Sequence, residues 1–182
     1  TLVGVSCASA SNCTAVGTYT DGSGKDQALV QQYNGAGWSL VSAPDATDSG
    51  GNELGNELRG VSCDPVSGNC WAVGFSEPGT GGSSATNVQT LIEERTGGGS
   101  WVLVSSPDTS TSLDNVLFGV SCPDALDCIA AGNASNGSAD QALIETNLPP
   151  PAAVPEFPLG TVTGVGAAVL AGAYVARRRA AR

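Results

Sequence analysis

The sequence predicts an all-β body of three similar repeats, followed by one C-terminal transmembrane helix. The tetrapeptide Gly-Val-Ser-Cys occurs three times, ending at Cys7, Cys63 and Cys122, so that it recurs at intervals of 56 and 59 residues. The body shows no sustained apolar period of 3.6 residues, which argues against helices there. The uncharged stretch at 159–176 is different, because it is long enough for a single membrane-spanning helix.

Each repeat carries the same series of short apolar segments, which we interpret as β-strands. After Gly-Val-Ser-Cys come a segment of the Ala-Val-Gly type, a segment of the Ala-Leu-Val type and, in the first two repeats, a segment that begins with tryptophan. All are rich in Val, Leu, Ile, Trp or Cys and are bounded by turn-forming residues. Alternation places Trp38 with Leu40, and Trp101 with Leu103, on one face of the strand, and we expect both tryptophans in the core. The third repeat has prolines in place of the tryptophan segment.

Four strands in a repeat of this length are typical of one blade of a β-propeller. We therefore predict three four-stranded, propeller-type blades in residues 1–148, at 1–55, 56–115 and a truncated 116–148. The repeats differ in length mainly between their second and third strands, which puts the variable loops on one rim, where ligands usually bind. Propellers close with about four to eight blades. We expect this chain to be the C-terminal part of a longer protein; the alternative is an open arc, or assembly with other chains.

The order of these motifs resembles secreted propeller-like repeat proteins of the Kelch/BNR superfamily type, over residues 1–147. The turns before the two strand tryptophans are similar to the Asp-box turn of sialidase-like propellers. In that motif an aspartate stands two residues before the glycine, where this sequence has Tyr33 and Thr96. The resemblance therefore implies the fold and the turn geometry, and it does not extend to the catalytic arginine cluster of sialidases.

The six cysteines form three close pairs, and we expect one disulfide in each repeat. Each pair flanks a turn, so a hairpin brings its two cysteines opposite each other. Such use of cysteine indicates an extracellular location. A metal site is the alternative, but the spacing is not Cys-x2-Cys and the chain has no histidine. The predicted pairs are Cys7 with Cys13, Cys63 with Cys70, and Cys122 with Cys128.

The C-terminal tail combines a proline-rich stalk at 149–158, the uncharged segment at 159–176 and an arginine-rich end at 177–182. As a helix, the uncharged segment spans roughly 27 Å, close to the thickness of a bilayer core. The positive-inside rule then places the arginines in the cytoplasm and the acidic repeats outside the cell. A buried Ala/Gly helix of a soluble domain is the alternative interpretation.

The tail also resembles the tripartite sorting signals called PEF-CTERM in archaea and PEP-CTERM in bacteria. The resemblance implies recognition and cleavage by a membrane-embedded archaeosortase or exosortase. We therefore expect the protein at the extracellular face of the cell envelope, anchored in the membrane at least transiently. The matching residues are Pro155, Glu156, Phe157, Arg177, Arg178 and Arg179.

Composition excludes several functions. With 17 acidic and 7 basic residues the net charge is −10, which argues against nucleic-acid binding through phosphate contacts. The absence of histidine excludes a Ser-His or Cys-His nucleophile and a histidine-ligated metal site. No carboxylate pair has a fixed separation, so the sequence predicts no catalytic residue, and we expect neither a cofactor nor a metal.

Three further sites are hypotheses. Asn133 and Asn136 begin glycosylation sequons in a predicted loop, although turn formation explains them equally well. In the carbohydrate-binding hypothesis, an exposed Trp71 or Tyr33 stacks on a sugar. Trp71 is the less constrained residue, because its equivalent positions in the other repeats have no tryptophan. Residues 21–26 have the composition of a calcium loop but lack EF-hand spacing, and a solvated turn is favoured.

The leading functional hypothesis is a non-enzymatic cell-surface protein for adhesion, surface structure or ligand binding, with a surface glycan or a protein as its ligand. The alternative is the C-terminal fragment of an extracellular glycan-active hydrolase or of a carbohydrate-binding propeller. Propellers host both kinds of function, so the fold alone cannot decide between them.

Overall fold

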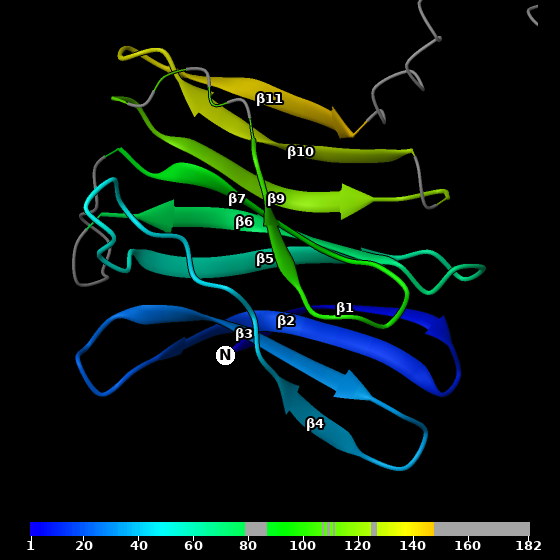
Figure 1. Ribbon diagram of the computed structural model, residues 1–182. Coiled ribbons are helices and arrows are strands. Elements are labelled where there is room, and N and C mark those ends of the chain that lie inside the picture. The colour runs from blue at the N-terminus through cyan, green and yellow to red at the C-terminus, as the bar shows by residue number, and fades with distance from the viewer. Residues whose placement is uncertain (79–86, 107, 109, 111, 125–126, 148–182) are drawn as a thin grey trace, which may run out of the picture. The chain divides into compact units, whose positions relative to one another are not determined.

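The structure, a computed structural model, describes residues 1–78, 87–106, 108, 110, 112–124 and 127–147. Every regular element in these residues is a β-strand, and the strands form three antiparallel sheets (Figure 1). The prediction of an all-β body is therefore confirmed. The predicted stalk, membrane helix and sorting signal, at 149–182, lie outside the described residues. Within the described part, no helix is long and apolar enough to cross a membrane.

Each sheet consists of consecutive strands of one repeat. Sheet 1 contains β1–β4, sheet 2 contains β5–β8, and sheet 3 contains β9–β11, which leaves three described strands where the fold prediction had four. The second and third sheets begin at Gly55 and Asn115, each one residue before the predicted repeat boundary. The strands are β1 Leu2–Ser9, β2 Asn12–Thr20, β3 Asp26–Tyr33, β4 Trp38–Val41, β5 Gly55–Cys63, β6 Cys70–Glu77, β7 Gln89–Arg95, β8 Val102–Val104, β9 Asn115–Ser121, β10 Cys128–Ser135 and β11 Asp140–Asn147.

A disulfide closes the first hairpin of each sheet. In sheets 1 and 2 the two bonded cysteines lie directly opposite each other in the strand register. In sheet 3 the bond joins the residue after β9 to the first residue of β10. All six cysteines are bonded, so none is a free thiol for a metal or for redox chemistry. The disulfides are Cys7–Cys13, Cys63–Cys70 and Cys122–Cys128.

The glycines of the repeat motifs permit close approaches of the backbone. A Cβ on Gly60 would lie only 2.9 Å from the Cα of Gly119, so the first strands of sheets 2 and 3 approach closely at glycine. A Cβ on Gly74 would lie 1.9 Å from the carbonyl oxygen of Glu57, opposite a shift in the β5–β6 register. The equivalent glycines, Gly17 and Gly132, show the same clash.

The serine of Gly-Val-Ser-Cys forms a hydrogen bond between successive repeats. The Oγ of Ser6 accepts a hydrogen bond from the backbone N–H of Cys63, with an N···O distance of 2.9 Å. The Oγ of Ser62 accepts the equivalent bond from Cys122 at 3.0 Å. In the first two motifs, glycine permits the close approach of the next repeat, and serine accepts a hydrogen bond from it. Cysteine forms the disulfide to the next strand of its own sheet.

Two buried asparagines, for which we made no prediction, form hydrogen bonds with the backbone just before the second and third sheets begin. The Nδ2 of Asn56 donates to the carbonyl oxygen of Leu54 at 2.8 Å, and that of Asn115 donates to Leu113 at 2.9 Å. Both asparagines are fully buried. Each stands four residues before Gly-Val-Ser-Cys, so the full repeat signal is Asn-x-Leu-x-Gly-Val-Ser-Cys.

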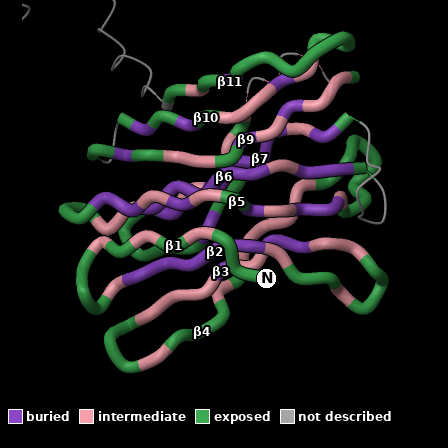
Figure 2. The backbone as a smooth tube through the Cα atoms, turned by 180° about the vertical axis from the view of Figure 1, so that it is seen from behind, coloured by how far each residue is buried: buried purple, intermediate pink, exposed green. Residues whose placement is uncertain are grey.

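Two apolar clusters lie between the sheets, and sheet 2 contributes to both because alternate residues of a strand point to opposite faces. Figure 2 shows the resulting line of buried residues along β6. Sheets 1 and 2 meet at Val16, Val30, Leu58, Val61, Cys70, Ala72, Leu91 and Trp101, among others. Sheets 2 and 3 meet at Trp71, Val73, Ile92, Leu117, Cys128, Ala130 and Leu143, among others.

The outward faces of sheets 1 and 3 expose the repeat equivalents of these core residues. Trp101 is only 4% exposed, whereas its equivalent Trp38 is 49% exposed. The prediction of a core position is thus confirmed for Trp101 and wrong for Trp38, because no described sheet packs on that face of sheet 1. On sheet 3, Ile144 is 67% exposed, whereas its equivalent Ile92 lies in the second cluster.

Candidate binding groove

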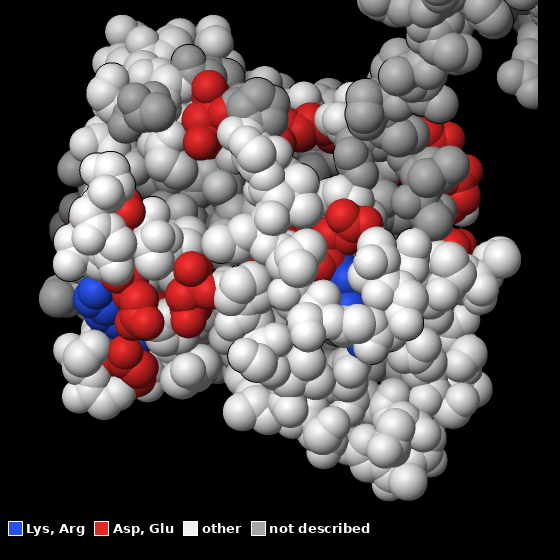
Figure 3. Space-filling model, viewed as in Figure 1, with Lys and Arg blue, Asp and Glu red and all other residues white. Residues whose placement is uncertain are grey.

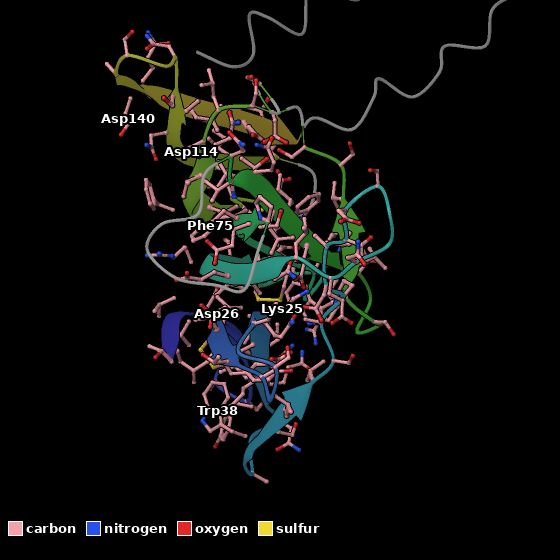
Figure 4. The ribbon with its side chains drawn as sticks, turned by 90° about the vertical axis from the view of Figure 1, so that its left-hand side faces the viewer. Lys25, Asp26, Trp38, Phe75, Asp114 and Asp140 are labelled. Atoms are coloured by element: carbon pink, nitrogen blue, oxygen red, sulfur yellow. A yellow bond between two sulfur atoms is a disulfide. The ribbon has the colours of Figure 1, made fainter. Side chains whose placement is uncertain are left out.

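A groove of about 510 Å³, here called the rim groove, opens at one end of the sheets. The β2–β3, β6–β7 and β10–β11 hairpins turn at this end, and these are the loops whose length varies between repeats. Figure 4 looks at this end and shows Asp26, Phe75, Asp114 and Asp140 spread across the three sheets. The groove is lined by Asp26, Glu57, Arg59, Phe75, Glu77, Val88, Asp114, Val116, Phe118, Asn133 and Asp140.

Arg59 is held in place in the groove by its neighbours on sheet 2. Alternation along β5 puts Arg59 on the same face as Glu57, and its Nε lies 2.8 Å from Oε1 of that carboxylate. Its guanidinium carbon also lies 5.3 Å from the ring centroid of Phe75, which pairs with Glu57 across the sheet. Arg59, which is the only arginine among the described groove residues, is therefore engaged by a carboxylate and an aromatic face.

Carboxylates dominate the remainder of the groove. Among the described residues that line it, five are acidic and one is an arginine. Two of the acidic residues also accept hydrogen bonds from neighbouring residues: Oδ1 of Asp26 accepts from the hydroxyl of Thr20 at 2.7 Å, and Oδ1 of Asp114 accepts from the backbone N–H of Val88 at 3.1 Å. The face of the protein in Figure 3 shows the same composition, because its few Lys and Arg atoms lie beside Asp and Glu. The groove therefore favours positively charged or neutral ligands and repels polyanions.

The carboxyl groups with raised pKa lie outside the rim groove. Burial, together with the smaller effect of the charge of Asp45, raises the pKa of Glu93 to about 8. Burial also raises the pKa of Glu145, against the lowering effect of a hydrogen bond from Ser106, whose hydroxyl donates at 2.7 Å. Both glutamates lie between sheets, so neither is placed to act as an acid or base on a ligand in the groove.

Trp71 is buried, with 5% of its surface exposed, so the prediction of an exposed stacking platform is wrong. The residue lies on the face of β6 that packs against sheet 3. Its equivalent in sheet 1, Thr14, is also buried, because it faces sheet 2. The equivalent in sheet 3, Ile129, is exposed only because that face is outward.

The two sequon asparagines have different environments. Asn133 lies within β10, not in the predicted loop, and its side-chain oxygen is buried without a hydrogen-bond partner among the described residues. Asn136 is exposed in the turn that follows. Its side-chain oxygen accepts from the backbone N–H groups of Ser138 and Ala139, both at 2.9 Å. Asn136 is therefore the more accessible acceptor for a glycan, while it also stabilises the turn.

The segment at 21–26 forms a tight turn around one carboxylate. Oδ1 of Asp21 accepts hydrogen bonds from the hydroxyl and the backbone N–H of Ser23, each at 2.7 Å, and from the backbone N–H of Lys25 at 3.0 Å. The hydroxyl of Ser23 is the main reason that the pKa of Asp21 falls to about 2. In the described ranges no three His, Cys, Asp or Glu side chains gather as a metal site.

The sequence located the rim but not the side chains of the groove. The loops of variable length lie at the end of the sheets where the groove opens, whereas Phe75, Phe118 and Asp114 carried no signal in the sequence. Asp140 carried one, because it and Asp26 begin the same Asp-Gln-Ala-Leu segment in two repeats and both line the groove. No protein-family model matches the sequence, and no curated protein is similar to it.

Proposed function

We propose that the protein is a non-enzymatic repeat protein of the cell surface that binds a ligand in the rim groove. The observation that carries this proposal is the groove itself, to which all three sheets contribute. Its carboxylates accept hydrogen bonds from hydroxyl or ammonium groups, and Phe75 and Phe118 offer apolar faces. We infer a surface glycan with neutral or amino sugars, or a basic protein segment, as the ligand, in a role such as adhesion or surface structure.

The proposal includes a propeller-type arrangement of the sheets. Support comes from the two outward faces, which carry the same apolar positions that the sheets bury against each other. The outward face of sheet 1 exposes Leu2, Val5 and Trp38, whose equivalents on sheet 2 are Leu58, Val61 and Trp101 in the first interface. Such a face has the apolar positions that a further repeat of the same kind would need in order to pack in the way that sheet 1 packs on sheet 2.

The proposal also places the protein outside the cell. Three disulfides are compatible with an extracellular location. The tail adds the resemblance to a sorting signal at Pro155, Glu156 and Phe157, with a membrane anchor at 159–176 and an archaeosortase or exosortase as the processing partner. Protease treatment of intact cells tests this location, and the expected result is digestion of the repeats. Recovery of the protein only from the cytosol would contradict the proposal.

Ligand binding is tested with the full chain, purified in mild detergent, on an array of neutral, amino and acidic glycans and basic peptides. Phe118→Ser and Asp140→Asn alter exposed residues of the groove and are expected to weaken binding about tenfold. The matched controls are Val102→Ser and Asp127→Asn, which alter exposed residues elsewhere and leave binding unchanged. Binding that prefers acidic glycans, or that survives both groove variants, contradicts the proposal.

A further inference from the structure

A second cavity, of about 310 Å³, lies between sheets 2 and 3. Trp71, Val73 and Ile92 line it from sheet 2, and Cys128, Ala130 and Leu143 line it from sheet 3. It is distinct from the rim groove, since the two share no lining residue. Its walls are mostly apolar, with the carboxylate of Glu145 at one side.

The first inter-sheet interface shows what occupies the corresponding space there. The sheet 3 wall of the cavity corresponds, repeat for repeat, to Cys70, Ala72 and Leu91. In the first interface those three residues form one cluster with Trp101, which is almost completely buried. The third repeat has no tryptophan segment, so the cavity lies where the indole of a fourth strand would be.

Among the described residues, the backbone beside the cavity also lacks a neighbouring strand. In sheets 1 and 2 the third strand pairs on its far side with β4 or β8, whereas β11 pairs only with β10 in the described part of the chain. The register of β8 on β7 pairs Leu103 with Glu93 and Val104 with Ile92. The same register on β11 pairs the leucine of an added strand with Glu145 and its valine with Ile144. Glu145 keeps one buried carboxylate oxygen without a hydrogen-bond partner among the described residues.

We propose that the edge of β11 and this cavity form a docking site for an added β-strand of the sequence type Trp-x-Leu-Val. The strand extends sheet 3 by antiparallel pairing, and its tryptophan fills the cavity between Trp71 and Ala130. The main-chain hydrogen bonds hold the strand, and the indole selects its register. This inference concerns the repeats alone and does not rest on the proposed location or on the rim groove.

The probe is a fluorescently labelled peptide with the sequence of residues 98–106, which contains the tryptophan strand of sheet 2. It is titrated into the full chain, and polarisation is measured. We expect saturable binding that is at least about tenfold weaker for the peptide with Trp101→Ala. This comparison uses the unaltered protein, so it does not depend on the folding of a variant.

Two protein variants locate the bound peptide. Ala130→Phe fills the cavity and is expected to weaken binding at least about tenfold. Ala131→Phe adds the same side chain on the opposite, exposed face of β10 and is expected to leave binding unchanged.

Three results would overturn the proposal: no binding, equal binding of the two peptides, or equal weakening by the two variants. Self-association of the full chain, followed by light scattering, identifies one source of the strand. If Trp38→Ala and Ala130→Phe both abolish self-association, the strand is β4 of a second copy, and the docking site is supported.

Discussion

The two interfaces between the sheets are built from the same repeat positions but are filled differently. In the first, Trp101 closes the space between sheets 1 and 2 and packs on Leu91 and Ala72. In the second, the equivalent space is a cavity, and the larger Trp71 stands where the first interface has a threonine. The comparison teaches that the same repeat positions form the walls of both interfaces, whereas the space between the walls is filled only where a described fourth strand supplies a tryptophan.

The largest effect is expected for Trp101. Trp101→Ala leaves a cavity in the first interface and is expected to lower the free energy of unfolding by about 3–5 kcal/mol. Trp38→Ala, at the equivalent but half-exposed position, is the matched control and should cost about 1 kcal/mol or less. Chemical denaturation of both variants measures the difference in the free energy of unfolding. Equal losses would show that Trp38 and Trp101 do not differ in burial.

The second effect concerns the disulfides. Cys63 and Cys70 are both buried in the first interface, whereas Cys7 is exposed on the outward face of sheet 1. Replacing Cys63 and Cys70 together by alanine is expected to cost about 3–4 kcal/mol, from the lost loop constraint and the lost packing. The Cys7→Ala, Cys13→Ala pair should cost about 2 kcal/mol, mainly from the loop. Thermal unfolding of the two double variants measures both losses. A larger loss for the Cys7 and Cys13 pair than for the Cys63 and Cys70 pair would contradict this prediction.

A pH dependence follows from Glu93, which faces the first interface. Because burial raises its pKa from 4.5 to about 8, the folded protein holds this proton more tightly than the unfolded chain. The free energy of unfolding therefore falls as the pH rises from about 4.5 to 8, and Glu93 makes no such contribution below that range.

Glu93→Gln removes this dependence. It is expected to raise the free energy of unfolding at pH 8 by on the order of 3 kcal/mol and to flatten the slope between pH 4.5 and 8. Glu53→Gln, at an exposed position, is the control and should change little. Denaturation curves at a series of pH values measure both, and an unchanged slope in Glu93→Gln would contradict the assignment.

The smallest effect is expected for the serine between repeats. Ser62→Ala removes the acceptor of the N–H of Cys122 and should cost about 1 kcal/mol. Ser121 is its equivalent on sheet 3 and is exposed, so Ser121→Ala should be close to neutral. A similar cost for both variants would mean that this hydrogen bond does not connect the repeats.

Features that depend on one repeat could be predicted from the sequence. The strands, the hairpin cysteines and the end that carries the variable loops follow from local composition and spacing. Burial could not be predicted in the same way, because Trp38 and Trp101 have similar local sequences and differ only in whether another sheet covers them. The burial of Trp71 was missed for a related reason, since sheet 2 is covered on both faces.

Most residues of the rim groove could not be predicted from the sequence, for a different reason. Phe75 ends near Arg59 because β5 and β6 pair in a register that includes a shift, and Asp114 joins them from the connection before β9. Their proximity is a property of the packed sheets, so only a structure brings these residues together.

The central claim is that equivalent tryptophans differ in burial because the sheets form a series with an open outward face. Single-tryptophan variants test it directly, with the other two tryptophans replaced by phenylalanine and acrylamide quenching measured for each. The account predicts efficient quenching of Trp38 and strong protection of Trp101 and Trp71. Protection of Trp38 equal to that of Trp101 would contradict it.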